Sequence, residues 1–68
     1  MATFGERLKE LRKAKKMSMR ALATKIGVSD GAICRWEADE RTLRDDDILV
    51  QLTEIFGVTI TYMKGMSQ

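Results

Sequence analysis

The chain has 68 residues, which allows one domain at most, near the lower size limit for folding without a disulfide or a metal ion. One cysteine and no histidine exclude an internal disulfide and an ordinary set of zinc ligands. With 44% hydrophobic residues, 32% charged residues and no proline, the composition predicts one folded, soluble and mostly helical domain over residues 1–68.

Basic residues are concentrated at the start of the chain. Residues 1–25 carry eight basic and two acidic side chains, a net charge of +6, so the remainder carries −4 within a total of +2. This basic part could face nucleic-acid phosphates or simply solvate the outer face of a helix, and charge alone does not decide. Because no apolar run has the length of a membrane span and no signal peptide is visible, we expect a microbial or phage-infected cytoplasm and no membrane partner.

Helical spacing of apolar residues begins near the N-terminus. It predicts a first helix from residue 4 to about residue 16, with Thr3 and Glu6 forming a capping box. A second helix over residues 18–26 begins with a serine cap and ends at Gly27. Only Val28 and Ser29 then precede the next apolar period, so the sequence predicts a tight turn between two short helices.

The third predicted helix is capped by Ser29 and runs to about Ala38. Its apolar positions, Ala32, Ile33 and Trp36, cluster on one side and should pack inward. The opposite side has no large hydrophobic residue and is therefore expected to meet a partner. That side consists of Asp30, Gly31, Cys34 and Arg35.

A polar loop over residues 39–44 leads to a fourth helix, which starts at the aspartates of positions 45–47 and runs to Phe56. Gly57 ends it, and a short fifth helix over residues 60–64 is closed by Gly65. The three aspartates could also suggest a calcium or magnesium site. Since no EF-hand spacing follows, we interpret them as favourable charges at a helix start and expect no metal or cofactor.

Residues 18–38 thus combine a capped helix, a glycine turn and a second capped helix with a free polar face. This is the device by which proteins insert a helix into the DNA major groove. The backbone amides at the two helix starts lack acceptors within their helices and can bind phosphates.

Four segments make the pattern more specific, because they follow one another in order. They are FGERLKELRKAK, MSMRALATKIGVS, ICRWE and LTEIFGVTITYMKG. Together they resemble the Cro and phage-repressor helix-turn-helix family, often called the XRE family, over about residues 4–65. The resemblance implies an all-α, compact five-helix lambda-repressor-like domain with its helix-turn-helix at about residues 18–38. It also implies a recognition helix, phosphate contacts from the second helix start and the loop after the third helix, and two-fold dimers on near-palindromic operators.

The resemblance also implies which residues contact DNA. Arg35 is the leading base reader, because arginine can bind guanine O6 and N7 for about 1–3 kcal/mol of discrimination. Its alternatives are a phosphate contact or an ion pair with Asp39. Asp30 could accept from cytosine N4 or only favour the helix dipole, and Gly31 permits close approach of the backbone. The predicted phosphate contacts are Met19, Arg20, Lys25, Ser29, Arg41 and Arg44, of which Met19 stands where many relatives place glutamine and must use its backbone amide.

Two further positions of the family pattern are structural. Arg12 and Glu37 stand where related repressors join the first helix to the end of the third, which implies an internal ion pair. We assign Trp36 to the core, where its burial contributes about 1.5–3 kcal/mol or somewhat more. Cys34 is interpreted as a bystander thiol, although a redox-responsive role in the DNA-facing side is the alternative.

The expected activity is sequence-specific regulation of transcription, most simply repression, by a homodimer bound to double-stranded operator DNA. The predicted dimer interface comprises Val58, Ile60, Tyr62, Met63 and Met66, whose apolar character also suits core packing. Without a recognisable nucleophile and base, we expect neither an enzyme nor a small-molecule substrate. The alternatives are an antitoxin-like protein-interaction module with secondary DNA binding and a restriction-modification controller protein.

Overall fold

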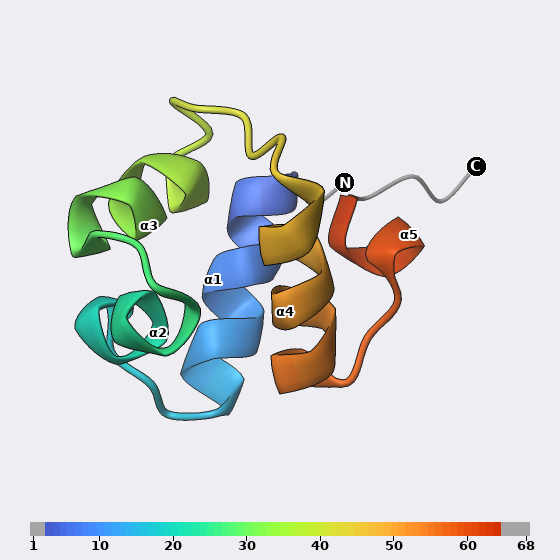
Figure 1. Cartoon of the computed structure of the whole chain (residues 1–68), viewed down its shortest axis with the longest axis horizontal. Coiled ribbons are helices and arrows are strands. Elements are labelled where there is room, and N and C mark those ends of the chain that lie inside the picture. The colour runs from blue at the N-terminus through green and yellow to red at the C-terminus, as the bar shows by residue number, and fades with distance from the viewer. Residues whose placement is uncertain (1–2, 65–68) are drawn as a thin grey trace.

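Five helices follow one another in the computed structural model, which describes residues 3–64 (Figure 1). They are α1 (Phe4–Ala14), α2 (Met19–Ile26), α3 (Asp30–Glu37), α4 (Asp46–Phe56) and α5 (Ile60–Lys64). No strand occurs within residues 3–64. The predicted all-α, five-helix fold is therefore confirmed.

The helices begin where the sequence places side chains that can cap them. In α1, the Thr3 hydroxyl accepts from the Glu6 amide while the Glu6 carboxylate accepts from the Thr3 amide, which completes the predicted capping box. The hydroxyl of Ser18 caps α2 and that of Ser29 caps α3, each by accepting from the amide three residues later. Because these contacts are local in sequence, the helix starts could be predicted from the chain alone.

The first four helices end in a common geometry, in which a residue in the left-handed conformation follows the last turn. It is glycine after α2 and α4, with φ of 78° at Gly27 and 67° at Gly57. After α1 and α3 it is Lys16 and Asp39, each with φ of 59°. A side chain in this conformation costs about 1–2 kcal/mol, so these two turns are strained where the other two are not. The turn also explains why α1 stops at Ala14, before the predicted end near residue 16.

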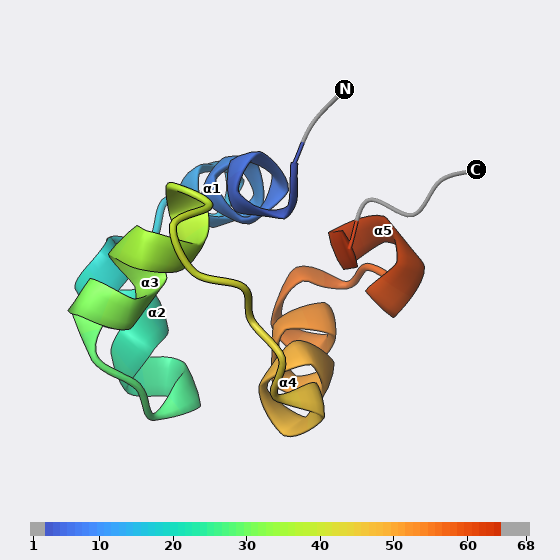
Figure 2. The same cartoon turned by 90° about the horizontal axis from the view of Figure 1, so that it is seen from above.

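Helices α2 and α3 form one group and α4 and α5 a second, with α1 between them in Figures 1 and 2. Helices α2 and α3 pack on each other and α3 packs on α1, while α4 and α5 pack together and α5 also contacts α1. The chain from residue 38 to residue 45 passes from one group to the other. Each helix contributes to the fully buried core, which contains Leu8, Leu22, Ile33, Leu49, Leu52 and Met63. Trp36 is 5% exposed, which confirms its assignment to the core.

Met63 requires a correction to the predicted dimer interface. Its side chain is fully buried, so it cannot contact a second copy of the folded chain. The reason is geometric: α5 has little more than one turn, and its neighbours Ile60 and Tyr62 occupy the exposed side, 40% and 43% exposed respectively. The apolar spacing of so short a helix did not distinguish its core-facing side from its outer side.

A close approach of two backbones fixes α1 against the end of α3. A Cβ atom at Gly5 would lie 2.5 Å from the carbonyl oxygens of both Trp36 and Glu37, so only glycine fits without movement of the backbone. The Asp39 carboxylate accepts from the Gly5 amide at 3.0 Å and from the Thr3 hydroxyl. The left-handed turn at Asp39 thus places a carboxylate over the start of α1, where the helix dipole favours a negative charge.

A buried ion pair makes a second connection between α1 and α3. The Arg12 Nε donates to Glu37 Oε2 at 2.6 Å and Nη2 donates to Oε1 at 3.1 Å, with 9% and 3% of the two side chains exposed. A third donor, Nη1, binds the Met17 carbonyl oxygen at 2.8 Å. The hydrogen bond to Glu37 raises the pKa of Arg12 above its usual value, although burial opposes this. The pair therefore holds the C-terminal end of α3 in a fixed position relative to α1.

Candidate nucleic-acid interface

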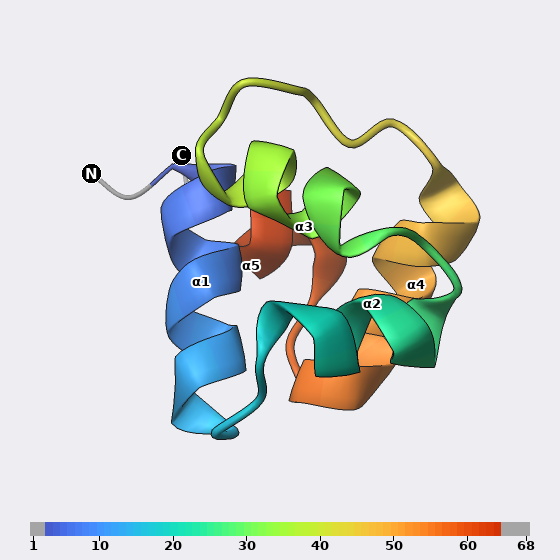
Figure 3. The same ribbon diagram turned by 90° about the vertical axis from the view of Figure 1, so that its left-hand side faces the viewer.

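The outward side of α3 lies at the surface next to α2, as Figure 3 shows. Asp30, Cys34 and Arg35 are exposed and Gly31 is half-buried, while Ile33 and Trp36 of the same helix are buried. The polar face predicted for the third helix is therefore exposed in the folded chain. Since the opposite face is anchored in the core and Glu37 is bound to Arg12, this helix is a rigid support for its exposed side chains.

Arg35 lies on this face without an acidic partner. The ion pairs within residues 3–64 are Arg12–Glu37 and Arg20–Asp30, and neither includes Arg35. Asp39, the alternative partner considered from the sequence, instead accepts hydrogen bonds from Thr3 and Gly5. The Arg35 guanidinium is consequently available to an external acceptor.

Asp30 contacts a residue of the preceding helix. Its Oδ2 lies 3.7 Å from the Nε of Arg20, and the two side chains are 53% and 84% exposed. Ser29 caps α3, because its hydroxyl accepts from the Ala32 amide. Asp30 therefore combines a first-turn charge with an ion pair that crosses from α3 to α2.

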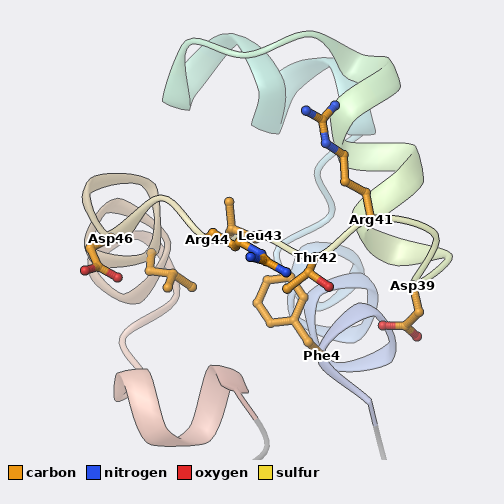
Figure 4. A pocket seen from close by; sticks show the side chains of 8 residues that line it. Phe4, Asp39, Arg41, Thr42, Leu43, Arg44 and Asp46 are labelled. Atoms are coloured by element: carbon orange, nitrogen blue, oxygen red, sulfur yellow. The ribbon is translucent and has the colours of Figure 1, made fainter.

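Ser29, Arg41 and Arg44 line one groove of about 680 Å³ between the start of α3, the loop after it and the start of α4. The same loop also lines a second cavity of about 470 Å³, which Arg41 and Arg44 share with Phe4, Leu43 and Leu49 (Figure 4). In this view Arg41 extends away from the Phe4 ring, while Arg44 lies beside it. Three predicted phosphate contacts are thus brought together beside the exposed face of α3.

Two other predicted phosphate contacts lie differently. The Met19 side chain is half-buried against the core, which leaves only its backbone amide for the role that we expected. Lys25 lines a separate groove between α2 and α4, together with Lys15, Met17, Gln51, Glu54 and Ile55. None of these residues lines the groove of Ser29, Arg41 and Arg44, so the structure does not unite Lys25 with the other predicted contacts.

The contacts that Asp39 makes were not predicted from the sequence. An aspartate in a polar loop is unremarkable, and its partners Thr3 and Gly5 lie more than thirty positions earlier. Gly5 was the available signal, because glycine inside a first helical turn often marks a close backbone approach. A further unpredicted contact places the Arg7 guanidinium 4.7 Å from the centre of the Tyr62 ring and connects α1 to α5.

The surface proposed for dimerisation is incomplete in the described residues. Ile60 and Tyr62 are exposed and Val58 is half-buried against the core, whereas Met66 lies outside residues 3–64. Val50 on α4 is also 43% exposed and was not predicted. Ile60 and Tyr62 are therefore the members of the predicted interface that can contact another chain in this structure.

The aspartates at the start of α4 serve the helix itself. The Asp45 carboxylate accepts from the amides of Asp47 and Ile48 at 2.9 and 3.3 Å.

Among the residues that the structure describes, no group of three or more acidic, cysteine or histidine side chains is arranged to hold a metal ion. None of the helices described is long and apolar enough to cross a membrane.

Two short helices joined at a glycine turn, the second with an anchored inner face and an exposed polar outer face, define a helix-turn-helix protein. A helix-turn-helix family model matches residues 8–63, which is most of the chain. The chain therefore belongs to this family, and its predicted resemblance to phage-repressor, or XRE-type, regulators is confirmed.

The P22 c2 repressor, solved in complex with a synthetic operator, is similar in structure with a TM-score of 0.83 and 32% identity, over 93% of this chain and 94% of that chain. SinR, a master regulator for biofilm formation solved in complex with DNA, has a TM-score of 0.79 and 26% identity, over 90% and 97% of the two chains. YobD of Bacillus subtilis, an uncharacterized HTH-type transcriptional regulator, is 32% identical over 64 residues. That match covers 94% of this chain but 56% of YobD, so the chain spans just over half of this relative.

Proposed function

We propose that this chain is a sequence-specific DNA-binding repressor, which binds a near-palindromic operator as a dimer with α3 in the major groove. The observation that carries the proposal is the Arg35 guanidinium, which is exposed and without an acidic partner on a helix fixed by the buried Arg12–Glu37 pair. The similarity to the P22 c2 repressor with its operator and to SinR with DNA supports this choice of partner.

Base reading is assigned to Arg35. The major groove admits one α-helix, and an arginine that reaches a guanine can donate to O6 and N7 together. Gly31 carries no side chain and is half-buried, so it allows the α3 backbone to approach the base pairs closely. Cys34 lies on the same exposed side and should be covered by DNA in the complex.

Phosphate contacts are assigned to the groups at the edges of α3. The serine caps of α2 and α3 accept from the third amide of each helix, which leaves the first two amides of each helix, at the positive end of the helix dipole, for phosphates. Ser29, Arg41 and Arg44 line a common groove beside α3, and each arginine supplies a cation for a phosphate contact there. Such contacts fix the position of the protein on DNA, and the base contact of Arg35 then discriminates between sequences.

The proposed dimer follows from the size of the chain. Its longest dimension is 32 Å and it carries one recognition helix, whereas half-sites on successive turns of DNA are about 34 Å apart. Two copies placed side by side can therefore present their α3 helices to successive turns. The exposed Ile60 and Tyr62 form the proposed contact between the copies.

A binding experiment with three proteins tests the proposal. The wild-type chain, Arg35→Ala and Arg35→Lys are titrated against DNA upstream of the protein's own gene and against scrambled DNA over a series of salt concentrations. We expect the native site to be preferred by about a thousandfold with a steep salt dependence. Arg35→Lys keeps the charge but not the paired donors, so it should lose preference for the site while retaining binding to scrambled DNA.

Equal and weak binding of both DNAs would contradict base reading at that site. A duplex library of random sequence then determines whether the chain prefers any sequence at all. If no sequence is enriched from the library, the proposed function is wrong, and binding to a protein partner would be tested next.

A further inference from the structure

The contact between Arg20 and Asp30 joins the first turns of the two helices that form the helix-turn-helix. Arg20 is the second residue of α2 and Asp30 is the first residue of α3, and their Nε and Oδ2 atoms lie 3.7 Å apart. Both side chains are more than half exposed. The pair therefore lies at the edge of the surface that we propose for DNA, where either residue could meet it.

An exposed pair of this kind contributes little to folding stability, because water screens the charges and both side chains lose freedom. The start of α3 does not depend on Asp30 either, since the Ser29 hydroxyl already accepts from the Ala32 amide. Within residues 3–64, none of the side-chain hydrogen bonds uses an N–H of Arg20 or an oxygen of Asp30. The Arg20–Asp30 contact thus contributes little to the stability of the fold. The N–H groups of Arg20 remain available to an acceptor outside the protein.

A carboxylate is also poorly suited to meet DNA directly at this position. It is repelled by phosphates, and on the major-groove edges of the bases it can accept only from the amino groups of cytosine and adenine. Next to Arg20, the negative charge of Asp30 is instead compensated by a cation that DNA attracts. Its useful effect is then to restrict the flexible arginine before DNA arrives, which lowers the entropy that binding must remove.

We infer that Asp30 is a positioning residue that acts through Arg20, holding the guanidinium at the edge of α3 for a contact with operator DNA. This inference rests on the proposed function and gives Asp30 a role beyond the two that the sequence left open, a contact with cytosine N4 or a favourable charge at the helix start. In this assignment Asp30 supports the contact that Arg20 of α2 makes with DNA, and Arg35 remains the residue of α3 that reads a base.

A double-mutant cycle tests this assignment. Binding is measured for the wild-type chain, Arg20→Ala, Asp30→Ala and the double variant, with duplexes that the wild-type chain enriches from a random-sequence library. Asp30→Ala should weaken binding by about two- to fivefold when Arg20 is present. In the Arg20→Ala background it should leave binding unchanged or strengthen it. The same cycle for Asp30 with Arg35 is the matched control and should be additive.

Two additional measurements separate positioning from a general effect of charge. Arg20→Ala should reduce the slope of log K against log salt by about one, as expected for the loss of one phosphate contact. Asp30→Glu keeps a carboxylate and should restore most of the binding that Asp30→Ala loses. Circular dichroism of each variant confirms that these exposed substitutions leave the helices intact.

Either of two results would overturn the inference while leaving the proposed function standing. If Asp30→Ala weakens binding equally in both Arg20 backgrounds, Asp30 contacts DNA directly. If it strengthens binding equally in both, Asp30 only repels DNA. A library that yields no preferred sequence is a different result, since it would overturn the proposed function and this inference with it.

Discussion

The guanidinium of Arg12 and the carboxylate of Glu37 form a two-point hydrogen-bonded pair inside the protein, across 25 positions of the sequence. Removal of either partner should leave the other charge buried without compensation. We expect Arg12→Ala and Glu37→Ala each to lower the free energy of unfolding by about 3–5 kcal/mol, measured by urea denaturation. The double variant Arg12→Met with Glu37→Leu, which replaces both charges by apolar groups, should be considerably less destabilised. Equal losses in the double and single variants would contradict this account of the pair.

The same pair also predicts the response to alkaline pH. Because the folded pKa of Arg12 lies above its unfolded value, the stabilisation is fully present below the unfolded value and disappears only as pH rises through the folded one. The difference in stability between wild type and Arg12→Ala should therefore remain constant up to about pH 10. A decline of this difference between neutral pH and pH 10 would show that the guanidinium is not held as described.

Gly5 and Gly31 both lie inside helices, but alanine should have opposite effects on stability at the two positions. A Cβ at Gly5 would collide with two backbone carbonyl oxygens at 2.5 Å, whereas a Cβ at Gly31 would have the Ser29 hydroxyl as its nearest neighbour, at 3.8 Å. Gly5→Ala should destabilise by about 1–3 kcal/mol through overpacking. Gly31→Ala should stabilise by about 0.5–1 kcal/mol, since alanine is the better helix former. Thermal denaturation of both variants tests these two expectations. A Gly5→Ala variant as stable as the wild type would disprove the close approach of α1 to the end of α3.

The two strained helix ends provide a matched pair of glycine substitutions. Lys16→Gly relieves a left-handed side chain and should stabilise the protein by about 0.5–1 kcal/mol. Asp39→Gly relieves the same strain but removes the acceptor for Thr3 and Gly5, so it should destabilise by about 1 kcal/mol. The difference between the two variants in their change of unfolding free energy, obtained by denaturation, measures how much the hydrogen bonds of the Asp39 carboxylate stabilise the protein. Stabilisation of equal size in both would mean that these hydrogen bonds contribute nothing.

The proposed dimer makes a prediction about two exposed apolar residues of similar accessibility. Ile60 is 40% exposed on α5 and Val50 is 43% exposed on α4, so glutamate should be tolerated in the fold at both positions. Ile60→Glu should shift sedimentation from dimer to monomer and weaken operator binding, while Val50→Glu should do neither. A wild-type chain that sediments as a monomer both alone and on operator DNA would eliminate this interface.

The sequence predicted the features of this fold that depend on neighbouring residues. The capping residues Thr3, Ser18 and Ser29 act on amides three positions away, so their chemistry is visible in a short window. Contacts between distant segments were not visible in this way. The Asp39 carboxylate and the strained turn at Lys16 arise from how the chain reverses and packs, and nothing in their local sequence requires them.

The candidate site was predicted unevenly for a similar reason. Helical periodicity placed Arg35 on the exposed side of α3, because this face follows from the burial of Ile33 and Trp36. Periodicity could not show that Asp30 lies beside Arg20, nor that Lys25 lines a different groove from Arg41. Those relationships depend on how α2, α3 and the following loop are placed against one another.

The central claim, that DNA covers the outer face of α3, can be tested most directly at Cys34. This is the single cysteine of the chain, and it is exposed on that face. The measurement is the rate at which iodoacetamide alkylates Cys34 under three conditions. They are no DNA, a saturating concentration of the operator duplex selected from the random-sequence library, and the same concentration of a scrambled duplex. We predict that the operator slows alkylation at least about tenfold while the scrambled duplex has little effect, in line with the expected specificity ratio. An unchanged rate on saturated operator would show that this face of α3 is open in the complex and would contradict the account.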